Sequence, residues 1–205
     1  MSGMDSIGEL VSDLAAATPI SLVNPYACFD PDIDRPGGAA IRTATLLAYL
    51  EARSHPALLL VGEAAGYQGC RFSGIAFTSE RALPTSQWTS TKREAWREPS
   101  ATIVHDALQE LGLEERTLLW NVVPFHPAGS SALSNRTPTA AERRAGTEWL
   151  RRIVAIVKPG VVAAIGRVAE AALRPGTPYL RHPAHGGAGR FRDGLGQLAR
   201  EHGLV

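Results

Sequence analysis

Three segments of this 205-residue sequence bring together residue types that catalytic and binding sites use. The first, residues 62–77, is rich in glycine and carries the carboxylate of Glu63. The second ends an apolar run with Asn121, and the third holds His182 and His185 ahead of a glycine-rich stretch. Glycines let a backbone approach a ligand closely. The side chains could accept a proton, read a polar edge and donate a hydrogen bond.

Each of these side chains also has an ordinary structural interpretation. Asn121 offers an acceptor and a donor side by side, which matches the C=O and N–H of an imide edge, but it could equally cap a turn. Glu63 is either a general base or a solvated turn carboxylate. Phe77, taken alone, is typical of a core residue. His182, fixed by the proline after it, suits a catalytic hydrogen-bond donor beside a mobile loop.

The same segments argue against most cofactors. The glycine spacing after position 62 is not G-x-G-x-x-G and no Walker lysine follows, so a nucleotide cofactor is disfavoured. His182 and His185 lack a nearby carboxylate or cysteine that would complete a metal site. The two cysteines, Cys28 and Cys70, are too few for an iron–sulfur cluster, which uses about four thiolates. A hydrolase elbow (G-x-S-x-G) and a P-loop are also missing. We therefore predict no metal and no other cofactor.

Helical patterns and apolar runs alternate along the chain. The helices and strands that they predict must hold the three segments in place. Apolar runs at residues 57–61, 118–123 and 160–165 are typical of strands covered on both faces, and Tyr179–Leu180 could be a short fourth strand. Apolar spacing predicts helices from about residue 7, over 39–53, over 103–111 and over 149–157, the last opened by a capping box of Thr139 and Glu142. Residues 24–38 are predicted as a loop.

This alternation predicts one domain over residues 1–205, a three-layer α/β/α sandwich around a short, mostly parallel four-stranded sheet. In such sheets the ligand site lies beyond the carboxyl ends of the strands. The three segments follow or end predicted strands, so we expect them to meet at one edge.

Composition limits the partners and the compartment. The net charge is +1 and 20% of residues are charged, which excludes a uniformly basic coat but allows a local basic patch near the C-terminus. The arginines there could contact phosphates or form a solvated face. No apolar run reaches the roughly 18–20 residues of a membrane span, and the start lacks the features of a signal peptide. We expect no membrane contact, reduced cysteines and a cytoplasmic, monomeric protein.

In their order and placement the segments resemble the uracil-DNA glycosylase superfamily. Residues 62–66 are similar to its first motif, residues 74–77 to the aromatic end that stacks on the base, and residues 182–184 to its closing His-Pro-Ser/Ala motif. Asn121 matches the Asn that reads the uracil edge. Residues 135–142 and 158–166 resemble the bacterial and archaeal branch that carries an iron–sulfur cluster.

The sequence also departs from the family. The cluster-bearing branch places cysteines near Phe125 and Gly146, and neither position is a thiol here. The best-known branch has a water-activating Asp at Ala64 and, at Gly66, a Tyr that excludes the methyl group of thymine. We therefore expect no cluster, and expect thymine to be excluded in another way, with Tyr67 as a candidate.

The resemblance implies a role for each matched residue. His182 would donate a hydrogen bond to the charge that develops on uracil O2, and Glu63 would position the attacking water. Phe77 would stack on the base and Asn121 would pair with its O4 and N3–H. The remaining base-binding residues are Gly62, Ala64, Ala65, Gly66 and Tyr67, with backbone N–H groups of residues 64–66 holding the carbonyls. The residues expected to contact DNA are His185, Gly186, Gly187 and Arg190, with Arg190 or Phe191 as the wedge that fills the gap left by the base.

The resemblance thus implies a DNA repair enzyme that flips uracil out of single- or double-stranded DNA and hydrolyses its N-glycosidic bond. The products would be free uracil and an abasic site. The missing acid at Ala64 leaves a second interpretation open, in which a relative of these enzymes binds uracil or a damaged base in DNA with little or no turnover.

Overall fold

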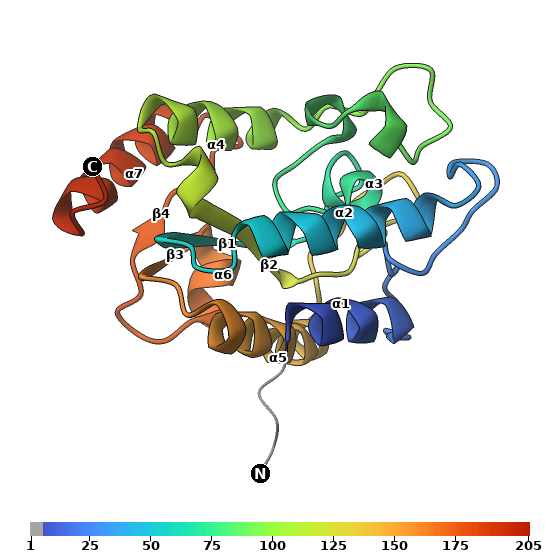
Figure 1. The fold of residues 1–205 in the computed structure, drawn as a ribbon, viewed down its shortest axis with the longest axis horizontal. Helices are drawn as coiled ribbons and strands as arrows, with labels where there is room; N and C mark the ends of the chain where they lie inside the picture. The colour runs from blue at the N-terminus through green and yellow to red at the C-terminus, as the bar shows by residue number, and fades with distance from the viewer. Residues whose placement is uncertain (1–5) are drawn as a thin grey trace, which may run out of the picture.

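A computed structural model describes residues 6–205 and shows a parallel sheet at the centre of the fold (Figure 1). β1 (Leu58–Ala64) lies between β2 (Thr117–Val123) and β3 (Val161–Ile165), and β4 (Tyr179–Leu180) pairs with β3. The strand order is β2-β1-β3-β4, and every pair is parallel. The predicted four-stranded sheet is confirmed. β1 runs further than the predicted residues 57–61, so Gly62 and Glu63 belong to the strand itself.

Helices cover both faces of this sheet. One face packs against α1 (Ile7–Ala16), α2 (Gly38–Ala52), α5 (Ala140–Val157) and α6 (Arg167–Ala172), and the other packs against α4 (Pro99–Glu110) and α7 (Ala188–Glu201). Alternate residues of β1 point to opposite faces. Leu59 and Val61 belong to the first core, and Leu58 and Leu60 belong to the second. The α/β/α sandwich is therefore as predicted.

Local sequence signals fix where several helices begin. Thr139 and Glu142 make the predicted capping box, in which the Thr139 hydroxyl accepts from the Glu142 amide and the Glu142 carboxylate accepts from the Thr139 amide. Ser6 and Glu9 make a second capping box at α1. α4 has a proline in its first turn, where the missing N–H leaves no helical hydrogen bond unmade. These signals place the helices that carry the two cores.

The long connection between β1 and α4 is only partly helical. It contains the single turn α3 (Cys70–Ser73) and the short 3-10 segments η1 (Glu80–Ala82) and η2 (Thr85–Gln87), and a third such segment, η3 (Glu114–Arg116), leads into β2. Because this connection leaves the carboxyl end of β1, it carries residues 65–77 along the edge where the site was expected.

α5 packs very closely on β2. A Cβ atom on Gly146 would lie 2.4 Å from the carbonyl oxygen of Val122, which leaves no room for a side chain at this position. Nearby, the rings of Phe125 and Trp149 pack edge to face with centroids 6.0 Å apart. Glycine and aromatic residues thus fill the places where the cluster-bearing branch has cysteines.

Candidate functional site

The carboxyl ends of β1 and β2 bring three predicted site residues into contact. Gly62 is paired with Asn121 across the two strands. A Cβ atom on Gly62 would lie 2.4 Å from Cε2 of Phe77 and 2.7 Å from Oδ1 of Asn121, so both side chains rest directly on this glycine. The strand pairing therefore explains the glycine, because any larger residue would displace the ring and the carboxamide.

The Asn121 carboxamide is buried and unpartnered. The residue is 5% exposed, and no group in residues 6–205 forms a hydrogen bond with its side chain. Nε1 of Trp120 and Nε2 of His126 are fully buried without a partner in the same residues, whereas the unpartnered polar atoms of Asn121 keep a small contact with solvent. A ligand that supplies one donor and one acceptor can therefore reach them. An Asn that only caps a turn would already have its partner.

Phe77 holds an unfavourable backbone conformation. Its φ is +49°, in the left-handed region that non-glycine residues rarely occupy, and its side chain is almost completely buried. Such residues cost about 1–3 kcal/mol and persist only where the surroundings enforce them, often at functional sites. The sequence suggested a core residue or a stacking ring, and the ring does belong to the core on the α4 and α7 face.

His182 lies beside this ring, just after β4. The imidazole and the Phe77 ring have centroids 6.2 Å apart at an angle of 40°. The Ala184 amide donates to Nδ1 of His182 over 3.2 Å, so the neutral ring carries its proton on Nε2. Burial, followed by the charges of Arg181 and His185, lowers the pKa of His182. The residue is therefore a neutral hydrogen-bond donor through Nε2.

The loop after β1 is held in place by its neighbours. The Ala65 amide donates to the Val123 carbonyl, and the Ala65 carbonyl accepts from His126 Nδ1 over 2.8 Å. The Tyr67 amide donates to Oδ1 of Asn135 over 3.0 Å. Among the backbone N–H groups of residues 64–66 that were expected to help hold the base, the N–H of Ala65 is already used. The Gly66 N–H has no partner within residues 6–205 and stays available.

Glu63 leaves the sheet on the opposite face from Gly62 and Asn121. Successive side chains of a strand alternate, so Glu63 shares the face of Leu59 and Val61, which is covered by α5. Burial raises the pKa of this half-buried carboxyl, and the charge of Arg143 on α5 opposes that shift. Glu63 is thus close to the site edge but does not join the cluster around Phe77, and its role in positioning water stays a prediction.

Tyr67 packs against an aromatic cluster beside the same loop. Its ring meets Trp96 edge to face at 5.4 Å, and Trp96 stacks on Phe72 at 5.8 Å. The ammonium of Lys92 lies 3.7 Å from the centre of the Trp96 ring. These contacts fix the Tyr67 ring, although its part in excluding thymine is untested.

The loop after His182 is shorter than the sequence predicted, because part of it is helical. Residues 188–190 already belong to α7, so the loop ends at Gly187, where it was expected to reach Arg190. Phe191 is fully buried in the core and cannot be the wedge. Gly187 is also buried, and it packs so closely on the His182 carbonyl oxygen that a Cβ there would have no room. His185 (φ +52°), Gly186 and Arg190 are exposed and could meet DNA.

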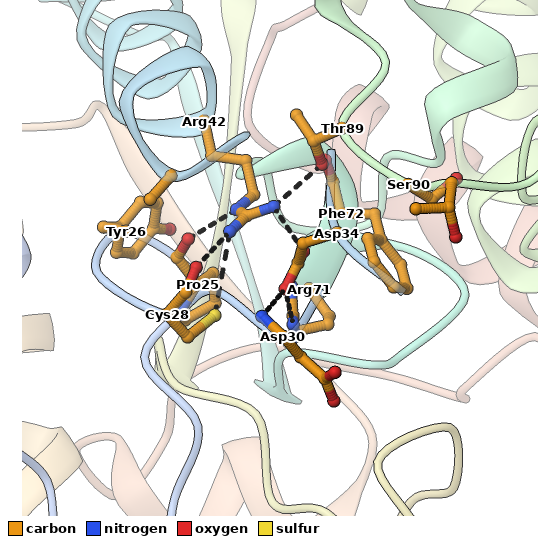
Figure 2. A network of polar contacts seen from close by, with 12 residues as sticks. Pro25, Tyr26, Cys28, Asp30, Asp34, Arg42, Arg71, Phe72, Thr89 and Ser90 are labelled. Carbon is orange, nitrogen blue, oxygen red and sulfur yellow. Dashed lines mark hydrogen bonds and ion pairs between the residues drawn. The ribbon is translucent and has the colours of Figure 1, made fainter. Parts of the chain in front are cut away.

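A buried ionic network supports the site from behind (Figure 2). The Asp34 carboxylate lies between two guanidinium groups, with Arg71 donating over 2.9 and 2.7 Å and Arg42 over 3.0 Å. Arg42 also donates to the Thr89 hydroxyl. Burial acts to raise the pKa of Asp34, but the hydrogen bonds and charges of the arginines hold it below its ordinary value. Because Arg71 lies on α3, the network fixes the segment that leads to Phe77.

Sequence reasoning missed the residues that hold the loops. Asn135 lies in a segment already singled out and His126 follows the second predicted strand, yet nothing local indicates that they bond to residues 67 and 65. Asp34 lies in a predicted loop, and its partners are 8 and 37 residues away. A signal existed only for Asp34, since an acid within a Pro-rich and Gly-rich loop often holds that loop by hydrogen bonds.

Residues 6–205 contain no group of three or more His, Cys, Asp or Glu side chains placed to hold a metal ion. Cys28 and Cys70 are free thiols, and burial raises the pKa of Cys70 to about 12. Among the helices of the described chain, none has the length and apolar character to cross a membrane.

Comparisons with known proteins bear on this arrangement. The family model described as Uracil DNA glycosylase superfamily matches residues 50–201, which is most of the chain. No curated protein sequence matches. The crystal structure of wild-type Pedobacter heparinus SMUG2 superposes with a TM-score of 0.63, covering 98% of this chain and 100% of that chain, at 14% sequence identity. At this identity the likeness shows a shared fold.

Proposed function

The chain belongs to the uracil DNA glycosylase superfamily, and we propose that it removes uracil from DNA by hydrolysing the bond between the base and deoxyribose. The observation that carries this proposal is the unpartnered carboxamide of Asn121 beside the ring of Phe77. Both side chains are almost completely buried, so a base that is still stacked within DNA cannot reach them. A base that is flipped out of the stack can enter the site and contact both.

The site residues favour uracil over cytosine. The Asn121 amide would donate to O4 of uracil and its oxygen would accept from N3–H. Cytosine presents the opposite pattern, with an amino group at C4 and an acceptor at N3. The free N–H of Gly66 could bind a base carbonyl, and Phe77 would stack on the ring. Tyr67 is our candidate for the residue that excludes the methyl group of thymine.

In the proposed reaction the C1′–N1 bond breaks and its electron pair goes to uracil. The base leaves as an anion with charge on O2, where the Nε2–H of His182 donates a hydrogen bond. Glu63, from the opposite face of the sheet at the same edge, would orient a water molecule that adds to C1′ of the cationic sugar, and would accept the proton that this water releases. The abasic site is then complete, and the uracil anion takes up a proton from solvent after it leaves. Donors placed where charge develops are usually the largest catalytic contribution.

The exposed segment beside His182 would contact the DNA backbone. His185 and Gly186 form the loop, and Arg190 lies in the first turn of α7. Arg190 has no acidic partner within residues 6–205, so its charge is available to a phosphate. With Phe191 in the core, Arg190 is the remaining candidate wedge.

The second candidate function is recognition of uracil or a damaged base with little turnover. The placement of Glu63 favours it, because this carboxylate lies on the other face from Asn121 and Ala64 replaces the acid of the best-known branch. Such a protein would use the same base contacts without efficient attack by water.

The test is a panel of oligonucleotides that carry uracil, a thymine mismatch, hypoxanthine or an abasic site. Strand scission after alkali reports base removal, and a separate binding assay reports recognition. We expect scission with uracil and none with thymine. Binding of uracil DNA without scission would favour the second function, and neither binding nor scission would contradict both.

Asn121→Asp is the matched variant for base reading. A carboxylate cannot donate to O4, so uracil scission should be lost, with a slight gain on cytosine because the carboxylate can accept from its amino group. Undiminished uracil scission by this variant would remove Asn121 from the base site.

A further inference from the structure

The backbone of Phe77 is held from outside the base site. Its left-handed conformation is unfavourable for a side chain with a Cβ, so some contact must enforce it. The Phe77 carbonyl accepts a hydrogen bond from Nε2 of His105 over 2.9 Å. His105 lies on α4, behind the ring and outside the proposed base contacts.

Every partner of the His105 ring is an acceptor. Nδ1 lies 2.7 Å from Oε1 of Glu114, and Nε2 faces the Phe77 carbonyl. The Thr78 hydroxyl is 3.3 Å from Nε2, but it donates its own proton to the Ala76 carbonyl over 3.1 Å. It therefore meets the imidazole as an acceptor. The arrangement is fully satisfied only when both ring nitrogens donate.

Glu114 is committed to this histidine. Its Oε1 bonds to Nδ1, while Oε2 is buried with no hydrogen-bond partner among residues 6–205. The two side chains are 21% and 23% exposed, so water screens their attraction only in part. They line a groove of about 530 Å³ on the side of the connection away from Asn121. The other charged groups that line this groove are Asp106 on α4, Arg53 just after α2, Arg81 in η1, and Arg97, and the charge of His105 also acts on Glu98 at the start of α4.

We propose that His105, oriented by Glu114, is a positioning residue that fixes Phe77 in the conformation needed to stack on the flipped base. This inference rests on the proposed function, because it takes the Phe77 ring as the stacking surface. His105 touches no reacting atom and acts only through the Phe77 carbonyl.

Two conservative substitutions separate this role from general packing. The amide nitrogen of a glutamine can take the place of Nε2, and that of an asparagine can take the place of Nδ1. His105→Gln should therefore keep the bond to Phe77, whereas His105→Asn keeps only the bond to Glu114. We expect single-turnover uracil release to fall about tenfold with His105→Asn and about two- to threefold with His105→Gln, the scale of one hydrogen bond. Equal losses, or the reverse order, would overturn the proposal.

A double-mutant cycle tests whether the effect passes through Phe77. If it does, His105→Asn should slow the reaction of the Phe77→Ala variant by less than a factor of two, since no ring is left to position. A full tenfold loss in that background would show that His105 acts by another route and would overturn the proposal.

A third measurement does not depend on catalysis. Nitrogen-15 spectra of histidine-labelled wild-type protein should show a proton on Nε2 of His105, the nitrogen that faces the Phe77 carbonyl, and Glu114→Gln should change the Nδ1 signal. A bare Nε2 in the wild type would overturn the proposed arrangement. If the wild-type protein releases no uracil, the proposed function fails, while the nitrogen spectrum still tests how His105 holds the Phe77 carbonyl.

Discussion

Residues 62–77 contact two polar clusters, one around Asn121 and one around Asp34, which differ in how far their buried polar groups are hydrogen-bonded. At the sheet edge the Asn121 carboxamide has no partner within the described chain. Behind α3 the Asp34 carboxylate accepts four hydrogen bonds, three from Arg42 and Arg71 and one from the Asp30 amide (Figure 2). Both residues are nearly or fully buried. Hydrogen-bond satisfaction, more than burial or charge, therefore distinguishes the structural cluster from the candidate binding site.

The largest effect should come from breaking the satisfied cluster. Asp34→Ala leaves two guanidinium groups buried without their counter-charge, which costs about 3–5 kcal/mol of the free energy of unfolding. Denaturant unfolding would measure this loss. Glu148→Gln, which breaks an exposed pair with Arg151, should change stability by less than about 1 kcal/mol. A similarly small loss for Asp34→Ala would mean that the network is not structural.

The next effect concerns chemistry and should leave stability nearly unchanged. His182→Ala removes the proposed donor to uracil O2 and should slow single-turnover cleavage about 100- to 1000-fold, the range seen for oxyanion donors. Binding of uracil DNA should change far less, because this interaction strengthens mainly in the transition state. His55→Ala, at an exposed histidine between α2 and β1, is the control and should keep the chemical rate. A His182→Ala variant as fast as the wild type would refute the assignment.

A third prediction compares two buried asparagines, one without a hydrogen-bond partner in the described chain and one with its hydrogen bonds made. Asn121→Leu removes a carboxamide that has no protein partner within residues 6–205, so the free energy of unfolding should not fall, while uracil cleavage is lost. Asn24→Leu is the control, because the Asn24 amide donates to the Leu14 and Ala17 carbonyls and its oxygen accepts from the Tyr26 amide. That variant should be destabilised. If both substitutions destabilise equally, the Asn121 carboxamide has a structural partner.

The smallest effect is the pH dependence. The proposed roles need an ionised Glu63 and a neutral His182, so the cleavage rate should rise with pH and fall as either group gains a proton. Burial raises the pKa of Glu63 and lowers that of His182, which moves both from their ordinary values of about 4.3 and 6.5 toward each other. The acid limb of the single-turnover rate should therefore lie between about pH 4.3 and 6.5.

Glu63→Gln separates the two contributions to this acid limb. It should lower the plateau rate and leave a limb governed by His182 alone, with uracil DNA still bound. An unchanged plateau rate would remove Glu63 from the mechanism and would favour the second candidate function.

The parts of the site that depend on strand order could be predicted from the sequence. Apolar runs locate the strands, and parallel strands place their carboxyl ends together, so the meeting of Asn121 with the motif at Gly62 follows from the pattern. The capping box at Thr139 also depends only on residues near each other in the chain. The spacing of apolar residues and the hydrogen-bonding side chains near a helix start are enough to predict these features.

The rest depends on information that a local pattern does not hold. Glu63 could not be assigned to a face because the predicted run ended at residue 61, and side chains alternate between faces only within a strand. Phe191 was open as a wedge because the first turn of α7 carries too little apolar pattern to show that it begins at Ala188. The bond between His105 and the Phe77 carbonyl joins residues 28 apart, and only the folded chain brings them together.

The contact between Gly146 and the Val122 carbonyl links the helix layer to the base site. A cysteine at this position would put its Cβ 2.4 Å from that oxygen, so α5 would have to move away from β2 before a thiol could fit. Any thiol at this position would therefore disturb the strand that carries Asn121, so Gly146 ties the distance between α5 and β2 to the shape of the base site.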